Sequence, residues 1–243
     1  MEIPVYLAMT ATEFRTCSTL PPHVGWLSCL FSPYGRGLSN IPKQLPPNSL
    51  LILSDRTPPL GHDPGLICET LSEIISNLSC SGLLLDFEQP NNNELLEIAN
   101  ALISLPCPVA VSASYARELD CPVFLPPPPP SSPLEHHIAP WAGREIWLEL
   151  SSMAETITVT GTGATTRSCS PSRVTMHKDA NLHCHYSIDL EEDYAIFTLQ
   201  RTLQDWEELL AAAPTLGITH AVGLSQELQS LPPSTSCIKF LIC

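Results

Sequence analysis

Two carboxylates near the middle of the chain have a spacing suited to acid–base chemistry. Asp86 and Glu88 end the segment Gly82-Leu83-Leu84-Leu85-Asp86-Phe87-Glu88, which is apolar up to the first carboxylate. In a strand, residues two apart point to the same side and lie roughly 6 to 7 Å apart. Burial beside a second carboxylate raises a pKa, so we expect Glu88 to hold a proton while Asp86 stays ionised. The pair predicts a general acid with its partner, an arrangement that can cleave glycosidic bonds.

Other polar residues also follow apolar segments, as expected for a site built at the carboxyl ends of strands. In a (β/α)₈ barrel these ends meet at one face, which carries the functional groups. A ring such as Tyr115 or Trp141 can in addition stack on a sugar. The expected substrate-binding set is Asp55, Ser112, Ser114, Tyr115, Glu149, Gln200 and Gln226.

Metal chemistry is an alternative interpretation of the same residues. Asp55, Asp86, Glu88 and Glu149 contain enough carboxylates for a metal-dependent hydrolase. His183 and His185 share one face of an alternating segment and could bind a metal with a third ligand, but we prefer the interpretation that they lie on a solvated hairpin face. The cysteines form no Cys-x-x-Cys pair. We therefore expect neither a metal nor another cofactor.

The elements that must position these residues alternate between strands and helices. Residues 49–54, 82–88 and 108–113 are short apolar runs typical of strands covered on both faces. Asp63 and Asn93 begin the two intervening helices, each with apolar residues on one side. Short connections between such elements indicate parallel strands joined by right-handed crossovers.

The flanking segments extend this pattern and bring the count to nine candidate strands. The count favours an α/β fold of the (β/α)₈ TIM-barrel type, occupying residues 1–229 as a single domain, with a C-terminal tail at 230–243. Residues 155–189 interrupt this alternation of strands and helices. Their segments alternate between apolar and polar residues, which predicts an antiparallel β insertion. The flanking candidates are residues 4–9, 25–31, 122–125, 145–150, 195–200 and 220–224.

The segment from Ser81 to Glu88 resembles the strand-four signature of family 18 glycoside hydrolases, Asp-Gly-x-Asp-x-Asp-x-Glu. The resemblance implies a (β/α)₈ barrel acting on glycans that contain N-acetylglucosamine. Glu88 matches the general acid, and Asp86 matches the residue that assists the substrate's own N-acetyl group as nucleophile. The family's insertion late in the barrel would correspond to residues 155–189.

Several positions depart from that family pattern. Ser81 and Leu84 replace the two earlier aspartates, and the Met-x-Tyr-Asp strand that holds the acetamido group has no match. The family's closing tryptophan is also missing from residues 220–224. These departures support a second hypothesis, a catalytically inactive barrel that binds a glycan or serves as a scaffold. Under either hypothesis the expected ligand is a carbohydrate or another small polar molecule.

Composition limits the other function classes. The chain has 243 residues with 11 Lys+Arg against 25 Asp+Glu, a net charge of −14. This balance argues against binding to nucleic acids or anionic membranes. No apolar run approaches the roughly 18 residues of a membrane span, and the N-terminus does not resemble a secretory signal. We therefore expect a cytoplasmic protein whose ten cysteines are mostly free thiols.

The 25 prolines predict many rigid loops, and five of them are consecutive. Pro126–Pro130 directly follows a candidate strand. Such a run is either a polyproline ligand for an SH3-like partner or a stiff connection between strand and helix. We adopt the second interpretation, because the run begins where a barrel requires a loop.

Overall fold

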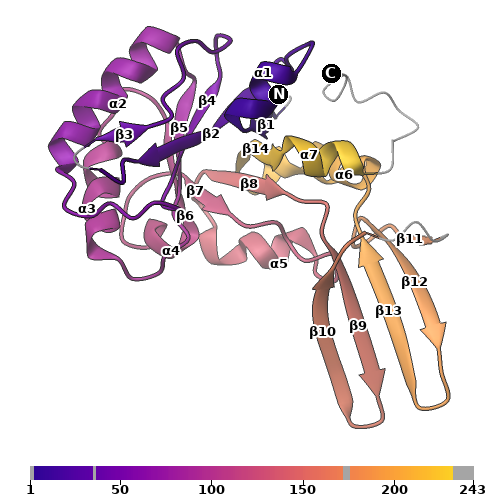
Figure 1. The fold of residues 1–243 in the computed structure, drawn as a ribbon. Coiled ribbons are helices and arrows are strands. Elements are labelled where there is room, and N and C mark those ends of the chain that lie inside the picture. Colours follow the sequence, from indigo (N-terminus) through magenta and orange to yellow (C-terminus); the bar gives the residue numbers. More distant parts are fainter. Residues whose placement is uncertain (1–2, 35–36, 172–175, 232–243) are drawn as a thin grey trace.

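A computed structural model describes residues 3–34, 37–171 and 176–231. The parallel strands are β1 (Val5–Met9), β2 (Val24–Phe31), β4 (Leu50–Ser54), β5 (Gly82–Asp86), β6 (Val109–Ser112), β7 (Val123–Leu125), β8 (Ile146–Leu150) and β14 (Ile218–Leu224). They are ordered β1-β14-β8-β7-β6-β5-β4-β2, and pairing of β1 with β2 closes the barrel (Figure 1). The predicted (β/α)₈ fold is confirmed. A short strand, β3 (Leu38–Ser39), pairs antiparallel with β2.

The strands are buried on both faces, as their continuous apolar runs predict. Ile52, Leu84 and Trp147 belong to the cluster that fills the barrel. The alternate residues of β4 and β5, such as Leu51 and Leu83, pack outward against the helices. Because these apolar residues occupy both sides of the strands, polar groups are confined mainly to the strand ends.

Helices cover the outside of the barrel, and local caps set where they begin. Asp63 accepts a hydrogen bond from the Gly65 amide at 2.9 Å, and Pro64 follows as the first helical residue. The next helix is capped by Asn92 and not by Asn93 as expected, because the Asn92 side chain accepts from two amides of the first turn. The helices are α1 (Ala11–Thr16), α2 (Pro64–Leu78), α3 (Asn93–Leu102), α4 (Ala113–Ala116), α5 (Leu134–Ile138), α6 (Leu203–Ala212) and α7 (Ser225–Ser230), with 3₁₀ turns η1 (Ala139–Trp141) and η2 (Ala213–Leu216).

A second, antiparallel sheet interrupts the barrel between β8 and α6, which confirms the predicted late insertion. Two of its hairpins project away from the barrel (Figure 1). The sheet runs from residue 154 to residue 200 and so extends beyond the expected 155–189. Its strands, in the order β10-β9-β13-β12-β11, are β9 (Ala154–Thr160), β10 (Gly163–Cys169), β11 (His177–Asp179), β12 (Cys184–Leu190) and β13 (Tyr194–Gln200).

The ninth candidate strand is explained by this sheet. We expected residues 195–200 to form a barrel strand, and this expectation was wrong, because β13 pairs with β9 and β12. Phe197, for example, lies opposite Ile157 and Ile188. Without β13 the parallel strands number eight, and β5 is the fourth of them along the chain.

The proline run lies in the connection between β7 and α5, where a loop was expected. Arg201, at the end of the inserted sheet, is buried against it. The Arg201 guanidinium donates hydrogen bonds to the carbonyls of Pro128 and Pro129, the latter at 3.2 Å, and to that of Leu182 at 3.4 Å. Barrel loop and inserted sheet are thereby joined through one side chain.

The expectations on membrane spans, cysteines and the C-terminal tail can be compared with the structure for the described residues. None of the helices in the described ranges is both long enough and apolar enough to cross a membrane. The cysteines in these ranges are free thiols, as expected. Of the tail at 230–243, residues 232–243 lie outside the described part of the chain.

Candidate active site

A cavity of about 400 Å³ lies at the carboxyl ends of the barrel strands. Below its rim, apolar residues including Ile52 and Leu84 line a smaller extension into the barrel interior. Asp86 and Glu149 line both spaces, so their carboxyl groups lie between an apolar floor and an open mouth. The polar lining of the larger cavity comprises Arg56, Asp86, Glu88, Ser112, Ser114 and Glu149.

Asp86 has a strongly perturbed environment. The pKa of its carboxyl group is raised to about 6, chiefly by burial and in addition by the negative charges of Glu88 and Asp55. Arg56 opposes this shift with its positive charge. At neutral pH a carboxyl group with this pKa is largely ionised, and it takes up its proton in mildly acidic solution.

Glu149, across the mouth on β8, is perturbed in the same direction. The pKa of Glu149 is raised to about 7, chiefly by burial and in addition by the negative charges of Asp86, Glu227 and Glu88. The three mouth carboxylates thus repel one another, and the two half-buried ones, Asp86 and Glu149, retain protons at higher pH than usual. The Glu88 side chain is exposed, so the burial that we expected around it falls instead on Asp86 and Glu149.

Asp55 and Tyr115 lie beside the cavity and bind the protein backbone. The Asp55 carboxylate is buried and accepts hydrogen bonds from the amides of Glu88 and Gln89, at 3.0 and 2.8 Å. The Tyr115 hydroxyl donates to the Gln89 carbonyl and accepts from the Asn92 amide at 3.3 Å. Neither side chain is part of the cavity lining. Both side chains hold the loop after β5 through these hydrogen bonds, and their substrate-binding role stays a prediction.

The two serines lie at the cavity itself. Ser112 ends β6, and its hydroxyl accepts from the Phe87 amide at 3.0 Å and donates to the Leu85 carbonyl at 3.1 Å. Ser114 lines the same space from α4. Of the expected set, the structure therefore brings Ser112, Ser114 and Glu149 together with Asp86 and Glu88.

Gln200 and Gln226 lie elsewhere. Gln200 ends β13 in the inserted sheet, opposite Ala154 and His185. Gln226 is an exposed residue of α7, and neither glutamine lines the cavity. For Gln200, the pattern of a polar residue after an apolar strand does not reveal that this strand, β13, belongs to the inserted sheet. Gln226 does follow a barrel strand, β14, but it lies on the helix after that strand.

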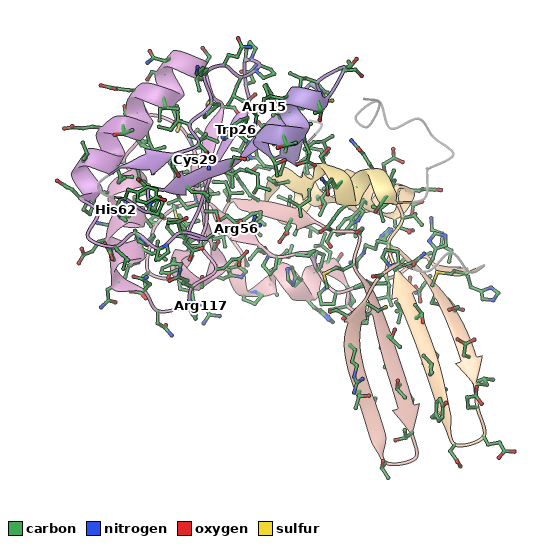
Figure 2. The ribbon with its side chains drawn as sticks, in the orientation of Figure 1. Arg15, Trp26, Cys29, Arg56, His62 and Arg117 are labelled. Carbon is green, nitrogen blue, oxygen red and sulfur yellow. The ribbon has the colours of Figure 1, made fainter. Side chains whose placement is uncertain are left out.

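Arg56 and Phe124 are site residues that the sequence reasoning missed. Arg56 directly follows Asp55 after β4 and is labelled in Figure 2. Arg56 is itself a polar residue that follows an apolar strand, so the pattern used for the other candidates could have identified it. Phe124 lies on β7 and lines both the cavity and its extension. In the sequence, an aromatic residue within an apolar strand cannot be told apart from an ordinary core residue, so nothing marked Phe124 as part of the cavity wall.

The histidines considered for a metal pair instead with acidic residues of α6. His185 Nδ1 lies 2.8 Å from an Asp205 oxygen, and His183 Nδ1 lies 3.4 Å from a Glu208 oxygen. Within the described residues, no three His, Cys, Asp or Glu side chains are grouped so that they could hold a metal ion. At the mouth, both Asp55 carboxylate oxygens are already bonded to amides.

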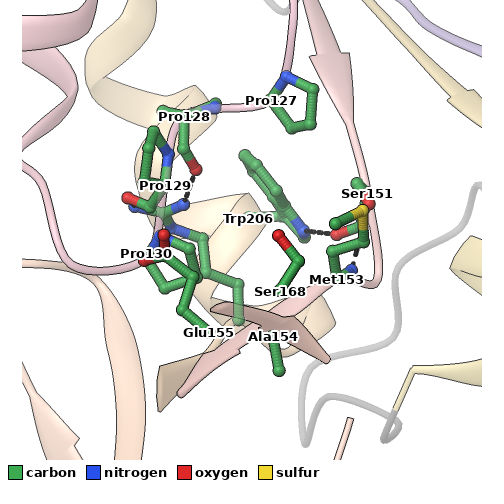
Figure 3. A pocket seen from close by; sticks show the side chains of 11 residues that line it. Pro127, Pro128, Pro129, Pro130, Ser151, Met153, Ala154, Glu155, Ser168 and Trp206 are labelled. Carbon is green, nitrogen blue, oxygen red and sulfur yellow. Dashed lines mark hydrogen bonds between the residues drawn. The ribbon is translucent and has the colours of Figure 1, made fainter. Parts of the chain in front are cut away.

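A second, smaller cavity of about 110 Å³ lies where the proline loop meets the inserted sheet (Figure 3). Trp206 forms part of its wall and donates from Nε1 to the Ser151 carbonyl at 3.1 Å. The Arg201 guanidinium lies 5.1 Å from the centre of the Trp206 ring. With Trp206 buried and Arg201 bonded to the proline carbonyls, this region joins the barrel to its insertion.

The chain shares its fold with enzymes of known structure. A chitinase from Chromobacterium violaceum ATCC 12472 superposes with a TM-score of 0.55 at 10% identity, covering 91% of this chain and 93% of the chitinase. The spore cortex-lytic enzyme SleL of Bacillus cereus superposes with a TM-score of 0.54 at 10% identity, covering 96% of this chain and 72% of SleL. No protein-family profile and no curated protein sequence matches the chain. At such low identity the similarity establishes a chitinase-like fold alone.

Proposed function

We propose that the protein is a glycoside hydrolase that cleaves glycans containing N-acetylglucosamine, with Glu88 as general acid. The observation that carries the proposal is the position of Glu88 and Asp86 in the mouth cavity, at the end of the fourth barrel strand. The fold neighbours are named as a chitinase and a spore cortex-lytic enzyme, which supports a glycan substrate. The resemblance of residues 81–88 to the family 18 signature supports the same assignment.

The proposed reaction uses the substrate's own acetamido group. Glu88 donates its proton to the glycosidic oxygen as the bond to the anomeric carbon breaks, while the acetamido oxygen attacks that carbon from the opposite side. Ionised Asp86 stabilises the positive charge that develops on the acetamido nitrogen. Glu88 then takes a proton from the water that opens the cyclic intermediate, which restores protonated Glu88 while Asp86 stays ionised. The bond-breaking step requires ionised Asp86 together with protonated Glu88, so turnover should fall as the pH drops below about 6 and Asp86 takes up its proton.

Glu149 is proposed to bind the substrate. It occupies the mouth opposite Asp86, while Phe124 and Pro126 line the cavity from β7 and the loop after it. Protonated Glu149 donates one hydrogen bond and accepts others, which suits a sugar hydroxyl or the acetamido carbonyl. Ser114 supplies a further hydroxyl at the same rim. Together these groups provide polar contacts to a neutral sugar.

Hydrolysis tests the proposal. Fluorogenic N-acetylglucosaminides and chito-oligosaccharides are incubated with the native protein, Glu88→Gln and the matched control Glu73→Gln, which removes an exposed carboxylate of α2. The native protein and control should release product, while Glu88→Gln should be at least about 100-fold slower. Equal hydrolysis by Glu88→Gln, or none by a folded native protein, would contradict the assignment.

A second candidate is an inactive barrel that binds a glycan. The observation favouring it is Leu84, which fills the barrel interior at a position where the family 18 signature has an aspartate. The described lining of the cavity also contains neither Trp nor Tyr for stacking on a sugar. Calorimetric titration with chito-oligosaccharides separates the two functions, because this candidate predicts binding by both the native protein and Glu88→Gln with turnover by neither.

A further inference from the structure

The direction of the Glu88 side chain depends on a loop and not on a barrel strand. Strand β5 ends at Asp86, so Phe87, Glu88 and Gln89 lie beyond the sheet pairing that fixes the strand. A catalytic carboxyl group needs a position defined to a fraction of an ångström. The backbone of residues 87–89 must therefore be fixed by contacts from outside β5.

Side chains from the two neighbouring strands supply these contacts. The amides of Glu88 and Gln89 both donate to Asp55, which follows β4, at 3.0 and 2.8 Å. The Gln89 side chain donates in return to the Asp55 carbonyl at 3.0 Å. On the other side, the Phe87 amide donates to Ser112 at the end of β6, at 3.0 Å. Three consecutive amides are thus held by two side chains that flank β5.

A ring from α4 completes this support. The Tyr115 hydroxyl donates to the Gln89 carbonyl, and its ring packs edge to face against Phe87 with centroids 5.8 Å apart. Asp55 and Tyr115 are both buried. A buried carboxylate that accepts two amide hydrogen bonds is strongly oriented, because an amide left without its acceptor would be costly.

We infer that Asp55 is a positioning residue, which fixes the Glu88 backbone through the amides of residues 88 and 89 and does not bind the substrate. The catalytic part of this inference rests on the proposed function, while the backbone contacts do not. Loss of the Asp55 carboxylate should therefore impair the use of Glu88 more than the binding of a glycan. If Asp55 contacted the sugar, loss of its carboxylate would weaken glycan binding more than it would slow the catalytic step.

Asp55→Asn keeps the size of the side chain but leaves only one oxygen to accept from two amides. We expect kcat for a chito-oligosaccharide to fall about 10- to 100-fold while KM changes less than about threefold. Glu73→Gln serves as the control for removal of one carboxylate and should leave both constants unchanged. A KM that rises while kcat stays constant would overturn the inference, because it would place Asp55 in contact with the substrate.

Residue-resolved amide hydrogen exchange tests the same contacts without any turnover. In the native protein the amides of Glu88 and Gln89 should be protected, and in Asp55→Asn they should exchange at least about 10-fold faster. Native amides that exchange as fast as exposed ones would overturn the inference even if the variant fails to fold. Absence of turnover in the native protein would instead contradict only the proposed function, so the two failures are distinguishable.

Discussion

At the scale of single residues, Asp86 and Glu149 are the carboxyl groups of the mouth whose charged forms are most strongly disfavoured. Each is placed between an apolar floor and like charges, and burial is the main cause of both raised pKa values, about 6 and about 7. Shifted pKa values of this kind are frequent in sites that transfer protons. Glu88 differs from them because its side chain is exposed at the rim.

The raised pKa of Glu149 predicts how the stability of the protein depends on pH. The unfolded chain loses this proton near the ordinary value of 4.5, whereas the folded protein keeps it up to about 7. The folded state therefore binds more protons in this window, so its stability falls as the pH rises. Glu149→Gln lacks this titration. Between pH 4.5 and pH 8, its free energy of unfolding relative to that of the native protein should therefore rise by on the order of 2 kcal/mol.

Urea unfolding of the native protein and Glu149→Gln at the two pH values measures this gain. Glu73→Gln provides the comparison for an exposed carboxylate on α2. A stability difference between Glu149→Gln and the native protein that is the same at pH 4.5 and pH 8 would show that Glu149 is not protonated abnormally.

At the scale of elements, β5 depends on a glycine at its start. A Cβ atom added to Gly82 would lie 3.0 Å from the Pro108 carbonyl oxygen and 3.0 Å from the Trp147 ring. Trp147 is fully buried inside the barrel, so it has little room to move. Gly82→Ala should therefore lower the free energy of unfolding by about 1–3 kcal/mol through overpacking.

Chemical denaturation checks this value against a glycine that lacks such neighbours. Gly161 lies between β9 and β10, and an added Cβ there has no neighbour within 4 Å. Gly161→Ala should leave the unfolding midpoint nearly unchanged. Equal effects of the two substitutions would mean that the Trp147 contact does not limit the space at Gly82.

Arg201 links two elements that are distant in the sequence. It donates to the carbonyls of Pro128, Pro129 and Leu182 and stacks on Trp206. Lysine has one ammonium nitrogen in place of the planar guanidinium fork, so its donors cannot reach these separate carbonyls together. Arg201→Lys should therefore destabilise the protein by on the order of 2 kcal/mol, because buried carbonyls lose their donors.

The matched control for this element is Arg167→Lys, which changes an exposed arginine on β10. Thermal unfolding of both variants is compared with that of the native protein. A melting temperature for Arg201→Lys equal to that of the control would contradict a linking role for the guanidinium.

The same elements explain how far the sequence could predict the fold. Strands such as β4 and β5 were recognisable because their side chains are apolar on both faces. Residues 195–200 have a similar composition, yet their partners β9 and β12 form a different sheet. Local sequence does not encode which strands pair, so Gln200 was assigned to a barrel strand although it ends β13 of the inserted sheet. Glu149 and Asp86 were placed correctly at strand ends, but their pKa values depend on a cavity that only the folded chain creates.

At the scale of the whole molecule, the barrel brings distant residues to one mouth. Asp86 on β5 and Glu149 on β8 meet in one cavity because the strands between them curve around the barrel. The chain carries a net charge of −14, and the described mouth has three carboxylates beside Arg56. A neutral glycan meets less electrostatic opposition at this mouth than a polyanionic one, in agreement with the proposed substrate class.

The proposed reaction is tested most directly by the configuration of the first product. Attack by the acetamido oxygen followed by attack by water inverts the anomeric carbon twice, so a β-linked chito-oligosaccharide should yield the β-anomer first. Proton NMR recorded within the first minutes of hydrolysis distinguishes the two anomers. We predict the β-anomer from the native protein and no product from Glu88→Gln on the same time scale. An initial α-anomer, or unchanged hydrolysis by Glu88→Gln, would contradict the mechanism assigned to this mouth.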